Sequence, residues 1–288
     1  MAQHTVAVVI PAYKAERFIA EAVRSVVAQT WSDWEVWVIA DDGTDYEELL
    51  GRAGLVSDRF HFLSTGRVAA GASRARNLAL DRITTPYAAI LDADDRMKPD
   101  KLALAIEAMG YAPIVSSALD VMTDSYRHLR YVGDGPDRLL DPAAYKFVSL
   151  SMDSMIVWDR RRCDARYDLA LTNMTDLEFL MQLWRTAREV HHLGTPQHDY
   201  VKVTGSMSNS DGITERMVAS KKALLERLEK GRYRFAAPRA AEGLISFLSL
   251  SLAAEAAFPM AVAERPGLLF EDHLEPMLRA YEARVAAV

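Results

Sequence analysis

The sequence predicts an α/β protein with a mainly parallel sheet flanked by helices and followed by a helical C-terminal extension. Short apolar runs alternate with segments of helical periodicity over residues 1–110, which is the pattern of βαβ units. Runs such as VAVVI are apolar throughout, as strands covered on both faces require. From Thr214 almost to the C-terminus the periodicity is helical, with breaks near Gly231, Pro238 and Pro266.

The individual elements follow from apolar runs of four to eight residues and from apolar residues at helical spacing. The expected strands are TVAVVIP (5–11), EVWVIADDG (35–43), FHFL (60–63), YAAILD (87–92), 112–122, 126–133, 154–159, HHLG (191–194) and DYVKV (199–203). The expected helices of the α/β part are 16–29, 72–83, 98–109 and 175–190.

A change of pattern near residue 210 suggests a domain boundary. The run TGSMSNSDG is rich in glycine, serine and asparagine and separates the α/β part from the helical part. We therefore expect an α/β domain over residues 1–210, with halves 1–105 and 106–210, and a helical extension over 211–288.

The composition is that of an ordinary globular protein, with 50% hydrophobic and 26% charged residues. The net charge of −6 argues against a nucleic-acid partner bound through phosphate neutralisation. The single cysteine, Cys163, excludes an intramolecular disulfide framework and a cysteine-based zinc site.

Two segments bear on membranes and location. The N-terminus lacks the basic start and cleavage site of a signal peptide, so we expect a cytoplasmic protein. The longest apolar region, residues 244–263, contains Glu255 and Pro259, whereas a membrane-spanning helix requires about 20 apolar residues. We expect a buried helix or one packed on a second subunit, and do not favour peripheral membrane contact.

Polar residues follow three of the predicted strands at their C-terminal ends. These are Pro11-Ala12-Tyr13, Asp41-Asp42-Gly43 and Asp92-Ala93-Asp94-Asp95. In parallel sheets ligands bind outside the carboxyl ends of the strands. We therefore expect the three turns to share one edge of the sheet and to form a ligand site.

The acidic turn admits two interpretations. Asp92 and Asp94 are two residues apart at a strand end, so both side chains can face one side while Ala93 faces away. Such a pair suits Mg²⁺ or Mn²⁺, which take one or two carboxylates and leave the other positions to water and phosphate. Alternatively, Asp95 or Asp100 caps the following helix. The acidic motif alone does not decide between these interpretations.

Four motifs in order resemble the inverting glycosyltransferases of family 2, which have the GT-A fold. They are VAVVIPAYKAERFIAEAVRSVVAQTW, VWVIADDGTD, GASRARNLAL and AAILDADD, and they cover about the first 105 residues. The resemblance implies a nucleotide-sugar-binding half over residues 1–105, an acceptor-binding half over 106–210, and a divalent metal, Mn²⁺ or Mg²⁺.

The resemblance also implies roles for particular residues. The donor nucleotide would be bound by Pro11, Ala12, Tyr13, Asp42, Arg76, Asp92, Ala93 and Asp94. Asp42 would accept a hydrogen bond from the base, and Arg76 would face the diphosphate or the base. Asp94 would be the leading metal ligand, with Asp92 on ribose or metal-bound water and Asp95 as a competitor for the metal.

The catalytic base is expected at the start of the helix 175–190. An inverting transfer needs a group that removes the acceptor proton as its oxygen attacks the anomeric carbon. The family places this base in a Glu-Asp pair that opens a helix, and LTNMTDLEFLMQLW fits with Thr175-Asp176 in that place. Asp176 is therefore the expected base, the alternative being an aspartate of the helix N-terminus.

The chain departs from the family pattern in two places. Val203 stands where a histidine can complete the metal shell, so water and phosphate, or His198 nearby, would have to do so. Lys14 stands where asparagine is common, and would contact phosphate or solvent. The run 204–214 is a candidate lid over the donor.

The function expected from these residues is the transfer of one sugar from a nucleoside-diphosphate sugar, with UDP favoured, to an acceptor hydroxyl in glycan or glycoconjugate biosynthesis. The processive signature Gln-x-x-Arg-Trp is absent. The alternatives are a retaining enzyme of the same fold and a non-catalytic domain that binds a sugar nucleotide. A homodimer through the C-terminal helices is also expected, and monomers in light scattering at micromolar concentration would contradict it.

Overall fold

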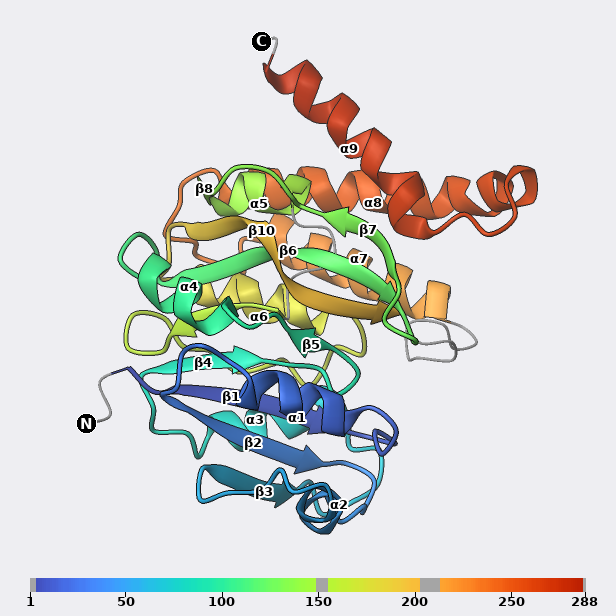
Figure 1. Ribbon diagram of the computed structural model, residues 1–288. Helices are drawn as coiled ribbons and strands as arrows, with labels where there is room; N and C mark the ends of the chain where they lie inside the picture. The colour runs from blue at the N-terminus through green and yellow to red at the C-terminus, as the bar shows by residue number, and fades with distance from the viewer. Residues whose placement is uncertain (1–3, 149–154, 203–212, 287–288) are drawn as a thin grey trace.

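The computed structural model describes residues 4–148, 155–202 and 213–286, and a single mixed sheet runs through the described part (Figure 1). The strand order is β3-β2-β1-β4-β9-β6-β10-β5, with β7 paired to β6 and β8 paired to β10. Helices flank the sheet and three more follow it, as predicted.

The first half of the sheet is parallel and covered on both faces. Its strands are β3 (Phe60–Ser64), β2 (Trp34–Ala40), β1 (Val6–Ala12) and β4 (Tyr87–Ile90). The helices of this half are α1 (Ile19–Val27), α2 (Tyr46–Arg52), α3 (Ala72–Leu80) and α4 (Lys101–Ala108). Val8 on one face of β1 packs in the same cluster as α1, and Val9 on the other face packs with α3. Both valines are fully buried, which is why the run VAVVI has no polar alternation.

The second half of the sheet is mixed. It contains β5 (Arg96–Met97), β6 (Ile114–Thr123), β7 (His128–Val132), β8 (Arg138–Leu140), β9 (Val157–Asp159) and β10 (Val190–Lys202), with helices α5 (Pro142–Val148) and α6 (Thr175–Leu183). Strand β9 is antiparallel to both β4 and β6, whereas β6 and β10 are parallel. The two short strands predicted at 191–194 and 199–203 are one strand, in which Pro196 coincides with shifts of register. Proline has no N–H to donate to a ladder, so the sequence predicted a break there. The strand nevertheless continues through Pro196.

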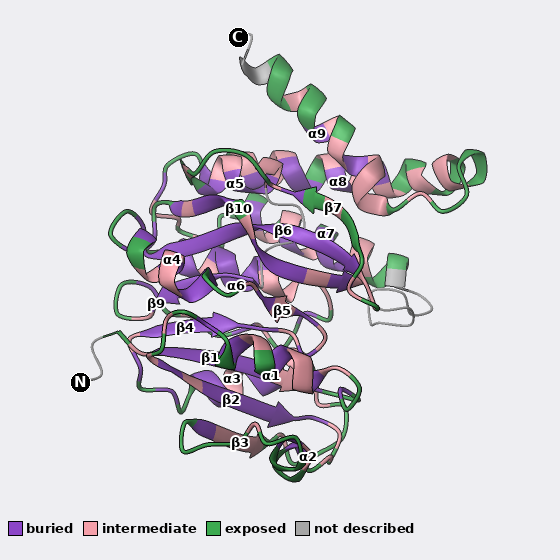
Figure 2. Cartoon of the chain, viewed as in Figure 1, coloured by how far each residue is buried: buried purple, intermediate pink, exposed green. Residues whose placement is uncertain are grey.

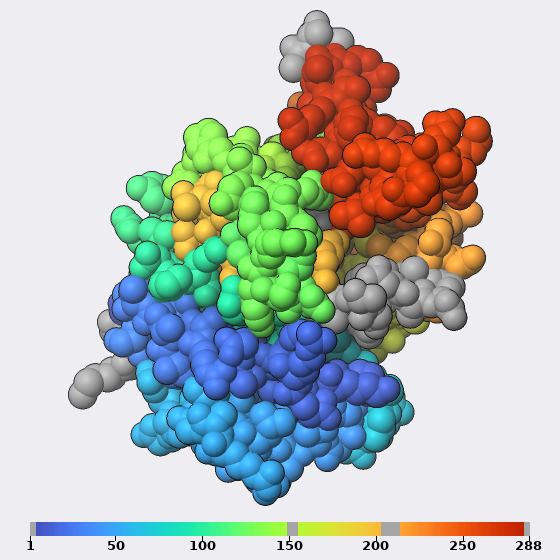
Figure 3. Space-filling view, turned by 45° about the vertical axis from the view of Figure 1, so that its right-hand side comes forward, coloured from blue at the N-terminus to red at the C-terminus, as the bar shows by residue number. Residues whose placement is uncertain are grey.

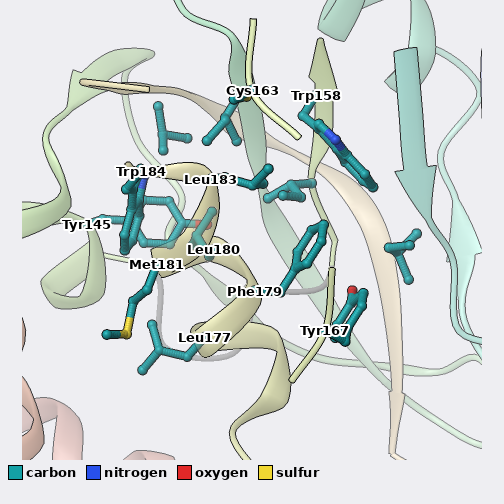
Figure 4. Close-up of a cluster of buried hydrophobic side chains, with 14 of the residues drawn as sticks. Tyr145, Trp158, Cys163, Tyr167, Leu177, Phe179, Leu180, Met181, Leu183 and Trp184 are labelled. Carbon is teal, nitrogen blue, oxygen red and sulfur yellow. The ribbon is translucent and has the colours of Figure 1, made fainter. Parts of the chain in front are cut away.

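The helical extension packs on the α/β part. It consists of α7 (Ile213–Glu229), α8 (Ala240–Glu264) and α9 (Phe270–Ala286). Leu224, Leu244 and Leu278 belong to the same buried cluster as the sheet residue Val9. Figure 4 shows the part of this cluster built around α6. The helical extension thus packs on the rest of the chain, while the predicted boundary near residue 210 lies outside the described residues.

Helix α8 is only partly covered by the described part of the molecule. By length and composition alone it could cross a membrane, because its most apolar window has a mean hydropathy of 1.6. Only 22% of that window is buried inside the molecule. Its first half carries buried residues such as Leu244 and Leu248, while Met260 near its end is 72% exposed. Figure 2 shows α9 and the end of α8 projecting beyond the rest of the molecule, and Figure 3 shows the same region from another side. The first half of α8 therefore packs one face into the core, but α8 is not the buried helix that was expected.

Two glycines in helices should respond to alanine with opposite signs. A Cβ at Gly243 in α8 would overlap the backbone of Ala143 in α5, whereas a Cβ at Gly51 in α2 meets nothing within 4 Å. Gly243→Ala should lower the free energy of unfolding by about 1–3 kcal/mol, because the two helices must separate. Gly51→Ala should raise it by about 0.5–1 kcal/mol, since alanine is the better helix former. Urea unfolding measures both; stabilisation by Gly243→Ala would contradict the close contact between α5 and α8.

Candidate active site

The three polar turns identified in the sequence lie at one edge of the sheet. Strands β1, β2 and β4 are parallel, with Ala12 aligned with Ala40 and Val9 aligned with Ile90. The amide of Leu91 still donates to the carbonyl of Val9 at 3.0 Å. The turns that follow the three strands therefore leave the sheet on the same side, as predicted.

Asp42 is held by its own turn. Its carboxylate accepts hydrogen bonds from the amide of Thr44 at 2.9 Å, from the hydroxyl of Tyr46 at 2.8 Å, and from the amide of Lys14. Burial opposes its ionisation, but the bonds from Thr44, Lys14 and Tyr46 outweigh this and lower the pKa of Asp42. Asp42 thus joins the turns after β1 and β2, and its contact with a nucleotide base stays a prediction.

Asp41 is an organising residue that the sequence did not single out. Its buried carboxylate accepts hydrogen bonds from the hydroxyl of Thr65 at 2.7 Å and from the amides of Ala70 at 2.9 Å and Gly71 at 2.8 Å. Gly71 has φ of 101° and begins α3. Asp41 therefore fixes the loop that sets the position of α3. The adjacent carboxylates in ADDG were a visible signal, but the sequence could not show which of them faces inward.

The side chains of Asp95 and His198 are buried inside the protein and do not face the surface at the acidic turn. Asp95 accepts from the amide of Val201 at 2.8 Å and lies 3.0 Å from Nε2 of His198, whose Nδ1 lies 2.7 Å from Nζ of Lys101. All three side chains are at most 2% exposed. Burial, followed by the charges of Asp94 and Asp92, raises the pKa of Asp95 well above its usual value. Because both ring nitrogens of His198 are engaged, it is not placed to complete a metal shell, and Asp95 is a poor candidate ligand.

Asp92 and Asp94 are half-buried, while Ala93 between them is buried. No other described residue hydrogen-bonds or ion-pairs with the Asp94 side chain. Burial and the neighbouring charge of Asp92 raise the pKa of Asp94 to about 6. A carboxylate so placed fits a bound cation, which would offset both effects.

The donor set fits a metal of the Mg²⁺ or Mn²⁺ type. In the described part of the chain no three His, Cys, Asp or Glu side chains are grouped to hold a metal ion. Two carboxylate ligands, with water and phosphate oxygens in the other positions, are what Mg²⁺ commonly takes. Asp94 with Asp92 therefore fits the expected metal.

Arg76 connects the acidic turn at residues 92–95, the donor turn of the predicted site, to Asp176, the predicted base. Its Nη2 lies 2.6 Å from Asp92, and its Nη1 lies 2.8 Å from Asp176 at the start of α6. The arginine is 4% exposed and its guanidinium lies 5.1 Å from the ring centre of Tyr167. Burial opposes its charge, but Asp176 and Asp92 outweigh this and raise the pKa of Arg76. The structure thus brings together three residues that the sequence had assigned separately.

The remaining predicted site residues lie around this centre. Pro11 and Ala12 end β1, and Tyr13 is 41% exposed beyond it. Lys14 adopts φ of 51°, and its ammonium lies 5.3 Å from the ring centre of Tyr13. Val203 lies outside the described residues, as does most of the candidate lid at 204–214.

Comparison with known proteins finds similarity to glycosyltransferases. Residues 7–132 match the family model described as glycosyl transferase family 2. The putative teichuronic acid biosynthesis glycosyltransferase TuaG of Bacillus subtilis is 36% identical over 105 residues, which cover 36% of this chain and 41% of that protein. The UDP-Glc:alpha-D-GlcNAc-diphosphoundecaprenol beta-1,3-glucosyltransferase WfgD of Escherichia coli is 35% identical over 109 residues, 38% of this chain and 42% of that protein.

Solved structures share the fold at low sequence identity. The S. aureus TarS 1–349 complex with UDP-GlcNAc has a TM-score of 0.70 and 15% identity, with 95% of this chain and 79% of that chain covered. The mannosyltransferase PcManGT of Pyrobaculum calidifontis, in complex with GDP-Man and Mn²⁺, has a TM-score of 0.55 and 18% identity, with 98% and 80% covered.

The fold is that of the GT-A glycosyltransferases, as the similarity to these solved structures shows. The match to glycosyl transferase family 2 covers residues 7–132, less than half of the chain. The chain spans about two fifths of the length of the curated relatives above.

Proposed function

We propose that this protein transfers one sugar from a nucleoside-diphosphate sugar to an acceptor hydroxyl, with inversion at the anomeric carbon and without processive elongation. The observation that carries the proposal is the contact of Arg76 with both Asp92 and Asp176. It places a carboxylate from the second half of the chain beside the turn that is expected to hold the donor. A general base must be within reach of the reacting atoms, and the closeness of Asp176 to this turn supports it in that role.

A UDP-sugar is the favoured donor. WfgD is named for UDP-Glc, and structures of TarS contain UDP-GlcNAc or UDP. In this protein the nucleotide would lie against the turns after β1 and β2, with Tyr13 and Asp42 toward the base. The names of TuaG and WfgD support an acceptor in polysaccharide or glycoconjugate biosynthesis.

Asp94 with Asp92 would hold Mn²⁺ or Mg²⁺. When bound, the ion supplies Lewis-acid stabilisation of the departing diphosphate. Asp94 suits this role because no other described side chain offsets its charge. Asp95, His198 and Lys101 support the turn from below and take no direct part.

Asp176 would act as the base in a single displacement. The acceptor oxygen forms a bond to the anomeric carbon as the bond to the diphosphate oxygen breaks, and the hydroxyl proton passes to the carboxylate of Asp176. The transition state carries oxocarbenium character, as in other glycosyl transfers. The contact with Arg76 holds one carboxylate oxygen of Asp176 in a fixed position.

Nucleotide-dependent thermal stability tests the donor site. We expect one diphosphate among UDP, GDP and dTDP to raise the melting temperature in the presence of Mn²⁺, because a ligand of the native state stabilises it. Asp94→Asn should lose this Mn²⁺-dependent rise, and the control Asp58→Asn, at an exposed loop position, should keep it. No rise with any nucleotide in the wild-type protein would contradict the proposal.

A homodimer through α8 and α9 and a cytoplasmic location stay predictions. The exposed end of α8 supports the dimer. Light scattering and cell fractionation, respectively, test them.

A further inference from the structure

The guanidinium of Arg76 connects parts of the chain that are far apart in sequence. It extends from α3 and contacts Asp176, which is 100 residues away, at 2.8 Å. It also contacts Asp92 at the end of β4 at 2.6 Å. Side-chain exposure is 5% for Arg76 and 32% for each aspartate, so the cation is enclosed while both carboxylates reach the site surface.

The position of this guanidinium is fixed from several sides. Burying a charge is costly unless it is paired, and each terminal nitrogen here has its own carboxylate. The nearby ring of Tyr167 stacks on Phe179 of α6 at 4.3 Å between centroids, and Figure 4 shows these two rings together. Helix α6 therefore supplies both Asp176 and a ring that supports the stacking partner of Arg76.

The chemistry of arginine suits a link between two carboxylates. Its planar fork directs separate N–H groups to separate acceptors, whereas the lysine ammonium is a compact point charge. Pairing with Nη1 fixes the orientation of the Asp176 carboxylate. Because Nη2 contacts Asp92, the Arg76 side chain holds Asp176 at a fixed position relative to the donor turn.

We propose that Arg76 is a positioning residue for the transfer reaction, which holds Asp176 in place beside the donor turn rather than serving mainly as a nucleotide contact. This inference rests on the proposed function, in which Asp176 is the base. Loss of Arg76 should therefore impair the chemical step more than donor binding. It should also have little further effect once Asp176 has been removed.

The test is a double-mutant cycle with Arg76→Gln, Asp176→Asn and the double variant, measured as nucleotide release. We expect Arg76→Gln to lower kcat by about 10²-fold with the donor KM within about threefold, since a misplaced base costs rate rather than binding. In the Asp176→Asn background the same change should lower kcat by less than about threefold. Arg76→Lys should recover about tenfold of the loss, because it restores one charged contact.

The matched control is Arg74→Gln, an exposed arginine of the same helix, which should retain wild-type kcat and KM. If Arg76→Gln does not fold, Arg76→Lys carries the cycle, with a loss of kcat in the wild-type background and little in the Asp176→Asn background. Additive losses, or a raised donor KM with unchanged kcat, would overturn the positioning role. Wild-type turnover by Asp176→Asn would instead overturn the proposed base, and the two failures are thereby distinguished.

Discussion

Replacement of Asp176 by asparagine is expected to reduce sugar transfer by about 10²- to 10⁴-fold, which is the usual contribution of a positioned general base. Asparagine has nearly the shape of aspartate and can still contact Arg76, but it cannot accept the acceptor proton. Nucleotide binding should persist, since the donor turns are built from other strands. The expected variant is thus folded, binds the nucleotide and is nearly inactive.

The measurement is product formation with the donor identified by thermal stability, together with the melting temperature with and without that nucleotide. Asp168→Asn is a suitable control because it also removes a carboxylate close before α6, where Asp168 pairs with Arg227 at 2.7 Å. It should leave turnover unchanged. Transfer retained by Asp176→Asn, or a product with retained configuration, would favour a retaining mechanism. Nucleotide binding without transfer by the wild-type protein would favour a non-catalytic domain.

The parallel half of the fold was predictable because its strands are buried on both faces. In β1 both Val8 and Val9 are fully buried, so the apolar run itself marks the strand. Two short helices were missed although their starts carried signals. The Asp45 side chain accepts from the amide of Glu48 at the start of α2, and that of Asp141 accepts from the amide of Ala144 at the start of α5. These helices have seven residues each, too few for a convincing apolar periodicity.

The candidate site was predictable in its parts but not in its connections. The sequence identified the acidic residues after β4, but the strand ends at Ile90 and Ala93 and Asp94 lie in a turn. The pairing of Arg76 with Asp176 joins residues 100 positions apart, and no local pattern encodes such a contact. The buried contact between Asp95 and His198 joins residues 103 positions apart and is likewise not encoded in a local pattern. Long-range ion pairs depend on the completed sheet, so sequence could name the residues without showing which of them face the ligand.

Replacement of Lys221 by methionine is expected to lower the free energy of unfolding by about 3–5 kcal/mol, because it leaves the carboxylate of Glu255 buried without its partner. Lys221 in α7 pairs with Glu255 in α8, and their side chains are 2% and 8% exposed. The Lys221 ammonium also lies 4.4 Å from the ring centre of Phe270 in α9. All three tail helices therefore meet at this side chain.

A double variant separates two contributions to the free energy of unfolding, the unpaired buried charge of Glu255 and the loss of packing. Lys221→Met combined with Glu255→Leu should return the free energy of unfolding close to the wild-type value, because apolar residues can replace a buried ion pair at little cost. Arg52→Ala, which removes an exposed pair with Glu48, is the matched control and should change the free energy of unfolding by less than about 1 kcal/mol.

Urea unfolding followed by tryptophan fluorescence reports on the α/β part, where Trp158 and Trp184 share a buried cluster with Leu244 of α8. A main transition unchanged by Lys221→Met would mean that the tail is a separable appendage. A shift of that transition would show that the helical extension and the α/β part unfold as one cooperative unit, as their shared core requires.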